Sequence, residues 1–204
     1  MKKLLIATTN RGKLKEFQHF LQDLPLELVS LADVGIDQDF EENGNSYAEN
    51  SEGKARFYAN LSGLPTLADD GGVEIDALGG MPGLHSKRWV GEDSTDEKII
   101  EKMKQVAKDL PGENRKASFI TMVTVVFPNG EKIQEEGRVD GIIAKEPLLE
   151  LLHGYPYRSF FYLPQIQKYY HERDLSGEEE KLYNHRYKAI EKLKPQLMEK
   201  LGIS

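Results

Sequence analysis

The chain has 204 residues, enough to bury a sizeable core in one domain. It contains no cysteine, which excludes disulfides, thiol catalysis and thiolate metal sites and suits a reducing cytoplasm. The net charge of -7, with both signs spread along the chain, argues against a protein that binds nucleic acid through a broad basic face. The apolar run after Met1 is too short for a signal peptide or a membrane span, so we expect a cytoplasmic protein without a membrane partner.

The first part of the chain alternates strand and helix patterns. Short apolar runs predict strands at residues 4–7 and 26–31, and helical spacing predicts helices at residues 12–24 and about 46–61. Residues 66–68 are expected to enter a turn at DDGG, residues 69–72. The alternation of Val73, Ile75 and Ala77 then predicts a half-buried strand.

The second part begins with a predicted capping box at residues 94–97, which opens a helix running to about residue 110. Residues 117–127 are rich in β-branched and aromatic residues, and Pro-Asn-Gly separates them from residues 132–139, which predicts a hairpin. The pattern from residue 176 onward is helical, and its expected apolar contacts are Leu182, Ile190, Leu193 and Leu197. Together these elements imply one α/β domain over residues 1–204, with a mixed, twisted sheet and flanking helices.

Three polar segments carry candidate chemistry. TTNRGKLKEF, residues 8–17, lies between the first strand and helix, where backbone N–H groups and Lys13 could hold a phosphate. An ordinary capped helix with solvated lysines explains the same residue types. In FEENGNSYAENSEGKA, residues 40–55, Glu41 and Glu42 lie beside an Asn-Gly turn; the alternative is a solvated acidic loop.

The third segment, LADDGGVEIDALGGMPGLHSKRW, spans residues 67–89. Asp69 and Asp70 are hard oxygen donors of the kind that magnesium prefers, and a carboxylate here can also deprotonate a water molecule. A tight turn with no ligand is the alternative. Phosphate donors, metal carboxylates and cations together favour phosphoryl chemistry.

These three segments, in this order, resemble the inosine triphosphate pyrophosphatase family, also called the Ham1-like family. The resemblance implies a mixed α/β fold of two lobes around a central cleft, in a homodimer. It implies hydrolysis of noncanonical purine nucleoside triphosphates (ITP, dITP, XTP) to monophosphate and pyrophosphate with Mg²⁺. By the same resemblance, Glu41 and Asp70 hold the metal, Asp70 accepts the proton of the attacking water, and Lys54 supplies charge. Exchanged roles within Glu41/Glu42 and Asp69/Asp70 stay open.

The resemblance also assigns substrate-binding residues. The phosphates would be bound by Thr8, Thr9, Asn10, Arg11, Gly12 and Lys13. The rest of the substrate would be bound by Gly71, Tyr155, Arg158, Lys181, His185 and Arg186.

The chain departs from the family at the base. Gly71 replaces a serine, Arg158 replaces an aspartate, and Lys181 is one residue closer to His185 than the family lysine is. Arg158 can only donate hydrogen bonds, which favours acceptor-rich base edges; alternatively it points away and pairs with an acid such as Glu172. Two alternative functions stay open. One is the same chemistry on a pyrimidine or modified nucleotide, and the other is nucleotide binding without catalysis.

Overall fold

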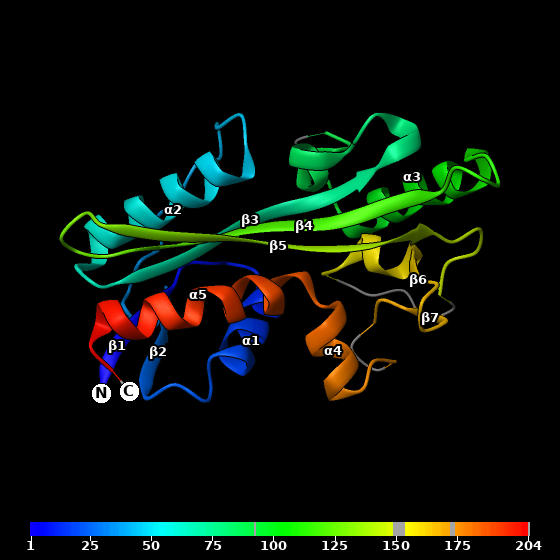
Figure 1. Ribbon diagram of the computed structural model, residues 1–204. Helices are drawn as coiled ribbons and strands as arrows, with labels where there is room; N and C mark the ends of the chain where they lie inside the picture. The colour runs from blue at the N-terminus through cyan, green and yellow to red at the C-terminus, as the bar shows by residue number, and fades with distance from the viewer. Residues whose placement is uncertain (92, 149–153, 172–173, 204) are drawn as a thin grey trace. The chain divides into compact units, whose positions relative to one another are not determined.

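The computed structural model describes residues 1–91, 93–148, 154–171 and 174–203, and within them seven strands form one mixed sheet in the order β2-β1-β3-β4-β5-β6-β7. The strands are β1 (Lys2–Ile6), β2 (Leu26–Ser30), β3 (Thr66–Ile75), β4 (Lys116–Val126), β5 (Lys132–Ile143), β6 (Phe161–Leu163) and β7 (Lys168–Tyr169). The helices are α1 (Arg11–Phe20), α2 (Tyr47–Ser62), α3 (Asp96–Asp109), α4 (Gly177–Tyr183) and α5 (His185–Leu201), with short 3₁₀ helices η1 (Asp76–Leu78), η2 (Gly83–Arg88) and η3 (Pro156–Phe160) (Figure 1). Because β1 pairs in parallel with β2 and β3, whereas β6 pairs antiparallel with β5 and β7, the predicted mixed α/β fold is confirmed.

The chain divides into two compact units. Unit 1 comprises Met1–Asp70, Thr121–Gly137 and Arg186–Ser204, and unit 2 comprises Gly71–Ile120 and Arg138–His185. The four boundaries between the units fall inside β3, β4 and β5 and at the start of α5. Within the described residues, no helix has both the length and the apolar character needed to cross a membrane.

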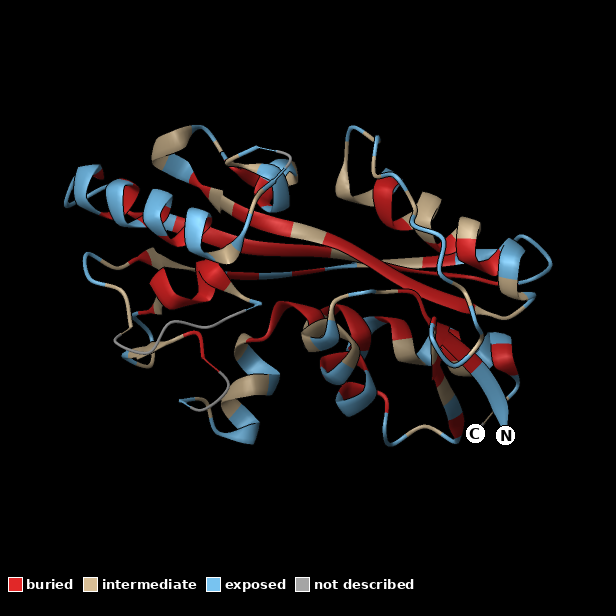
Figure 2. Ribbon diagram, turned by 180° about the vertical axis from the view of Figure 1, so that it is seen from behind, coloured by how far each residue is buried: buried red, intermediate tan, exposed pale blue. Residues whose placement is uncertain are grey.

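Helices cover both faces of the sheet in unit 1 (Figure 1). Side chains alternate along β1, so Leu4 and Ile6 pack with α1 and α5, while Leu5 packs with Ala55 and Tyr58 of α2. Figure 2 shows the result as buried strands between helices whose outer faces are exposed. This packing places the end of β1 and Asp69 of β3 near the start of α1.

Unit 2 has its own core, in which α3 packs on the strands. Met103 of α3 is fully buried with Phe119 and Phe161. Gly141 allows β6 to approach β5 closely, because a Cβ atom there would lie 2.6 Å from a ring atom of Phe161. Arg115 is buried and donates to the carbonyls of Ala107, Leu110, Ile143 and Ala144.

The predicted turn at residues 69–72 is wrong, because these residues lie inside β3. Asp69 and Asp70 are buried in the strand by partners that are remote in the sequence. The strand ends at Ile75, so Ala77 belongs to η1 and not to the predicted strand.

Three further predictions need correction. The first helix ends at Phe20 and not at residue 24, and turns follow it before β2. Thr95, not Ser94, caps α3, so position N3 is Lys98 and the predicted capping box does not form. Leu182 is 62% exposed because Asn184 separates α4 from α5, which breaks the helical register between Leu182 and the buried residues of α5. The other predicted helices and strands are confirmed in type.

Candidate active site

The predicted phosphate-binding residues lie where β1 leads into α1. Asn10 caps the helix: its Oδ1 accepts hydrogen bonds from the backbone N–H groups of Gly12 at 2.8 Å and Lys13 at 3.2 Å. The Oγ1 of Thr8 accepts one from the N–H of Asn10 at 3.2 Å. Thr9 and Arg11 are exposed. The capped-helix interpretation is therefore confirmed, but Lys13 is not solvated.

Lys13 turns inward to Asp69 of β3. Its Nζ lies 3.0 Å from Oδ1 of Asp69, and the carboxylate also accepts from Arg186 Nε at 3.0 Å and Thr121 Oγ1 at 3.2 Å. The side chain of Asp69 is 1% exposed. Burial favours its neutral form, but Lys13, Arg186 and Lys54 outweigh burial and hold the pKa of Asp69 well below its usual range. Asp69 is thus ionised, and its charge is neutralised by Lys13 and Arg186.

Arg186, at the start of α5, joins three elements. Besides Asp69, it contacts Glu16 of α1, with NH1 3.0 Å from Oε2. The contacts of its guanidinium with both carboxylates lie within unit 1. Glu16 lies in the first segment that carries the resemblance, but the resemblance gave it no role. Thr121 was not predicted, because a threonine in a β-branched run gives no sign of such a contact.

Asp70 has the opposite environment to its neighbour. It is 7% exposed, and its Oδ2 accepts a hydrogen bond from Nδ2 of Asn50 at 2.9 Å. Burial, followed by the negative charge of Glu42, raises the pKa of Asp70. A carboxylate with a raised pKa binds protons more readily than its neighbour, which is the property required of a proton acceptor.

Lys54 of α2 lies between the acidic loop and β3. Its Nζ forms an ion pair with Glu42 and donates to the backbone carbonyl of Asp69 at 3.2 Å. Burial opposes its charge, but the carboxylates of Glu42 and Asp69 raise the pKa of Lys54, so it is a cation. Glu41 is exposed, and no hydrogen bond or ion pair joins it to another described residue.

Two contacts anchor the loop that carries these glutamates. The N–H of Gly44 donates to Oδ1 of Asn50 at 2.7 Å, so one amide side chain holds both this loop and Asp70. The ring of Phe40 lies against Gly53 of α2, where a Cβ atom would be 2.8 Å from Cζ. The sequence motifs did not identify Asn50, because its two partners become its neighbours only in the fold.

The donor set around Asp70 fits a hard cation. Among described residues no three histidine or acidic side chains converge as a metal site. Magnesium needs only one or two protein carboxylates, with water and phosphate filling its remaining positions. Burial and then the negative charge of Glu42 raise the pKa of Asp70, and a bound cation would offset both effects.

The predicted base-binding residues of unit 2 form an aromatic cluster around Arg158. Arg158 is 3% exposed, with Cζ 4.0 Å from the ring centroid of Tyr155 and 4.5 Å from that of Tyr170. The hydroxyl of Tyr170 is 2.7 Å from Nδ1 of His185. Arg158 therefore does not point into solvent; Glu172, its suggested partner, lies outside the described residues.

Two predicted residues lie away from this cluster. Lys181 is exposed on α4 and pairs with Glu178 one turn earlier, with Nζ 2.7 Å from Oε1. Its assignment rested on a spacing that departs from the family, and no described contact joins it to the aromatic cluster. Gly71 lies in β3, directly after Asp70.

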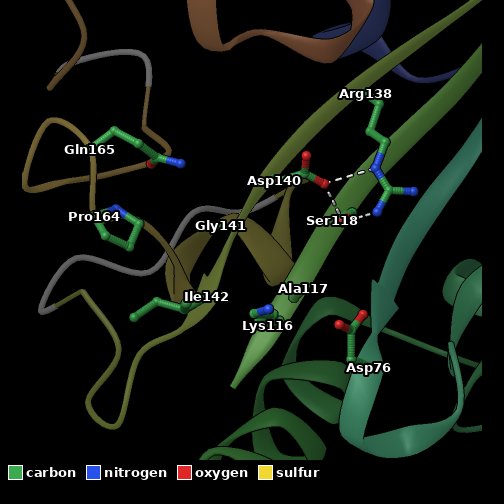
Figure 3. A pocket seen from close by; sticks show the side chains of 10 residues that line it. All are labelled: Asp76, Lys116, Ala117, Ser118, Arg138, Asp140, Gly141, Ile142, Pro164 and Gln165. Carbon is green, nitrogen blue, oxygen red and sulfur yellow. Dashed lines mark hydrogen bonds and ion pairs between the residues drawn. The ribbon is translucent and has the colours of Figure 1, made fainter. Parts of the chain in front are cut away.

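Unit 2 also contains an open pocket of about 440 Å³, which none of the predicted site residues lines (Figure 3). Its lining includes the cations Lys116 and Arg138. Arg138 is already engaged: Nε donates to Asp140 Oδ1 and NH2 donates to Ser118 Oγ, both at 2.7 Å. Ser118 in turn donates to Asp140 at 2.7 Å. This neutralised triangle does not favour a phosphate.

Comparisons with known proteins match nearly the whole chain. The Ham1 family model matches residues 4–196. A dITP/XTP pyrophosphatase from Clostridium perfringens is 38% identical over 203 residues, covering 97% of this chain and 98% of that protein. A HAM1 protein from Coxiella burnetii has a TM-score of 0.82 at 33% identity, covering 98% of this chain and 100% of its own. The Staphylococcus aureus Ham1 protein has a TM-score of 0.80 at 31% identity, with the same coverage.

Proposed function

This chain belongs to the Ham1 family, and from that premise we propose that it hydrolyses noncanonical purine nucleoside triphosphates such as ITP, dITP and XTP to monophosphate and pyrophosphate. Such an activity would remove deaminated purines from the nucleotide pool. The relatives named dITP/XTP pyrophosphatase support the substrate class. The site supports the reaction type.

The contrast between Asp69 and Asp70 carries the proposal. Asp69 is neutralised by Lys13 and Arg186, so it acts as a structural anion that fixes α1 and α5 to β3. Asp70 is held by an uncharged amide, and its pKa is raised. We therefore assign proton acceptance from the attacking water to Asp70 and not to Asp69.

Cations of unit 1 serve the leaving group. Cleavage of the bond between the α- and β-phosphates releases pyrophosphate, whose negative charge must be neutralised. We assign this to Lys13, Lys54 and the N–H groups at the start of α1, with Thr8, Thr9 and Arg11 as further donors. Lys54 is well suited because its raised pKa keeps it charged.

Asp70, with Glu41 from the adjoining loop, would hold a divalent cation, which we propose is Mg²⁺. Bound there, the ion would neutralise phosphate charge. We prefer Glu41 to Glu42 because Glu42 is paired with Lys54. The resemblance also implies a homodimer in the cytoplasm, and we include both in the proposal; light scattering coupled to size-exclusion chromatography tests the dimer.

The altered base loop supports a second candidate, in which the same reaction acts on a pyrimidine or modified nucleotide. Arg158 replaces the aspartate that the family usually has, so the base can differ while unit 1 keeps its chemistry. This candidate shares every assignment made to unit 1. Only the preferred base separates it from the first.

A panel of nucleoside triphosphates with Mg²⁺, assayed separately for pyrophosphate and orthophosphate, tests both candidates. We expect pyrophosphate release, fastest from ITP, dITP and XTP, and loss of at least about 100-fold in Asp70→Asn. Fastest turnover of a pyrimidine would select the second candidate. Tight binding measured by calorimetry without turnover of any nucleotide would identify a nucleotide-binding protein instead.

A further inference from the structure

The guanidinium of Arg158 lies over two tyrosine rings. Its Cζ is 4.0 Å from the centroid of Tyr155 and 4.5 Å from that of Tyr170, and the residue is 3% exposed. A planar guanidinium can stack on an aromatic ring with each of its faces, which a lysine ammonium cannot do. Arg158 therefore links the two tyrosine rings through contacts with its guanidinium.

This group extends to His185. Tyr170 is 1% exposed, and its hydroxyl lies 2.7 Å from Nδ1 of His185. One face of the imidazole stacks on Phe119, with the ring centroids 5.3 Å apart and the ring planes inclined by 28°. A displacement of Tyr170 would thus move the hydrogen-bonding partner of His185.

The segment carrying Arg158 is itself anchored in unit 2. The N–H of Arg158 donates to the carbonyl of Tyr155 at 3.0 Å, which closes the first turn of η3. The hydroxyl of Tyr157, which lies between them, donates to the carbonyl of Ser86 at 2.6 Å. These contacts fix the backbone, so the position of the Tyr155 ring depends on what supports its face.

We propose that Arg158 is a positioning residue: its guanidinium fixes the ring of Tyr155 and, through Tyr170, the imidazole of His185. This inference rests on the proposed function, in which Tyr155 and His185 contact the base. On this proposal Arg158, which is 3% exposed and lies over both rings, acts on the base through these neighbours and not by donating to its edge. Selectivity then follows the stacking surface, which any planar base can use.

Kinetics separate positioning from direct reading of the base. If Arg158 positions its neighbours, Arg158→Met lowers kcat/KM by about tenfold for every nucleotide hydrolysed and leaves the ratios between bases unchanged. Arg158→Lys keeps the charge but not the planar group, so we expect a loss between those of the methionine variant and wild type. Arg138→Met, which removes an arginine from the Asp140 pair in the same unit, is the matched control and should keep wild-type kinetics. Altered ratios between bases in Arg158→Met would overturn the proposal.

NMR of the His185 ring gives a readout that does not depend on turnover. The imidazole ¹⁵N resonances should shift or broaden in Arg158→Met and Arg158→Lys and stay unchanged in Arg138→Met. Unchanged resonances in both Arg158 variants would overturn the positioning role. Should Arg158→Met fail to fold, Arg158→Lys decides: wild-type rates and resonances in this variant reject the proposal. A wild-type protein that hydrolyses nothing refutes the proposed function, while the His185 resonances still test the contact with Arg158.

Discussion

Asn50 holds the carboxylate of Asp70 through a single amide, with Nδ2 2.9 Å from Oδ2. This hydrogen bond lowers the pKa of Asp70 and so opposes burial and Glu42, which raise it. Replacing Asn50 by Asp keeps the size but substitutes a negative charge for the donor. The pKa of Asp70 must then rise, and the acidic limb of the kcat/KM profile should move to higher pH by about one unit.

The control for this variant is Asn45→Asp, which adds the same charge at an exposed position near Asn50. It should leave the acidic limb in place. An equal shift in both variants would mean that the general charge of the loop, and not the hydrogen bond to Asp70, sets the profile.

Asn substitutions of the two aspartates should have opposite effects on stability. Asp69→Asn leaves the buried cations Lys13 and Arg186 without their shared anion, so it should cost about 3 kcal/mol in free energy of unfolding. Asp70→Asn removes a carboxylate whose raised pKa shows that ionisation is unfavourable in the folded state, so stability at pH 7 should be equal or higher. Urea denaturation in a chelating buffer measures both.

The pH dependence of the Asp69→Asn difference has a definite sign. Since the folded pKa of Asp69 is lowered, its stabilising contribution is complete above its unfolded pKa, about 4, and is lost as the pH falls toward the folded value. The gap between wild type and Asp69→Asn should therefore narrow from pH 7 to pH 3. A constant gap would show that Asp69 is not the ionised partner of these cations.

Gly53→Ala tests how the glutamate loop is held. The added Cβ would displace the ring of Phe40, which lies two residues or fewer from Glu41 and Glu42. The Mg²⁺ concentration for half-maximal activity should rise by about tenfold, as for loss of a group that orients a metal ligand. Stability should stay near wild type because alanine favours a helix over glycine by about 1 kcal/mol.

Gly177→Ala serves as the comparison, since open space surrounds the added Cβ in α4. It should leave the Mg²⁺ requirement unchanged. If Gly53→Ala also leaves the Mg²⁺ requirement unchanged, the contact between Phe40 and Gly53 does not position the loop that carries Glu41 and Glu42.

We expect Arg115 to contribute more to stability than any other side chain near α3. It donates to four backbone carbonyls, two of which, those of Ala107 and Leu110, lie at the end of α3. Arg115→Met leaves these acceptors without their donor and should cost about 3 kcal/mol in urea denaturation. Arg115→Lys should recover less than half of this loss, because an ammonium cannot reach carbonyls spread over the guanidinium fork. Full recovery by lysine would show that the four hydrogen bonds of the guanidinium do not account for the stabilisation.

Local patterns predicted most elements of the fold, because they arise from neighbouring residues. Helical spacing places α2, the β-branched run at residues 117–127 places β4, and the turn at Pro-Asn-Gly places β5. The error at residues 69–72 has a different cause. Asp and Gly favour a turn locally, and the strand is stabilised by Lys13 and Arg186, whose contacts with Asp69 span 56 and 117 residues.

The candidate site shows the same limit. Sequence motifs selected Asp70, Lys54 and Lys13, but they could not separate the two aspartates, because the difference lies in tertiary partners such as Asn50 and Arg186. For Arg158, the reversed charge suggested a base reader or a surface ion pair. Its burial against Tyr155 and Tyr170 could not be predicted, because Tyr170 comes close to residues 155–158 only in the fold.

The pairing of Asp69 with Arg186 also orders events during translation. A ribosome that has just made Asp69 must add 117 residues before Arg186 exists, whereas Lys13 is already present. Until then Asp69 has only part of its counter-charge, and unit 1 lacks Ile190 and Leu193 from its core. A nascent chain stopped before residue 186 would therefore leave this strand incompletely packed, so the surroundings of Asp69 are completed only after α5 has been synthesised.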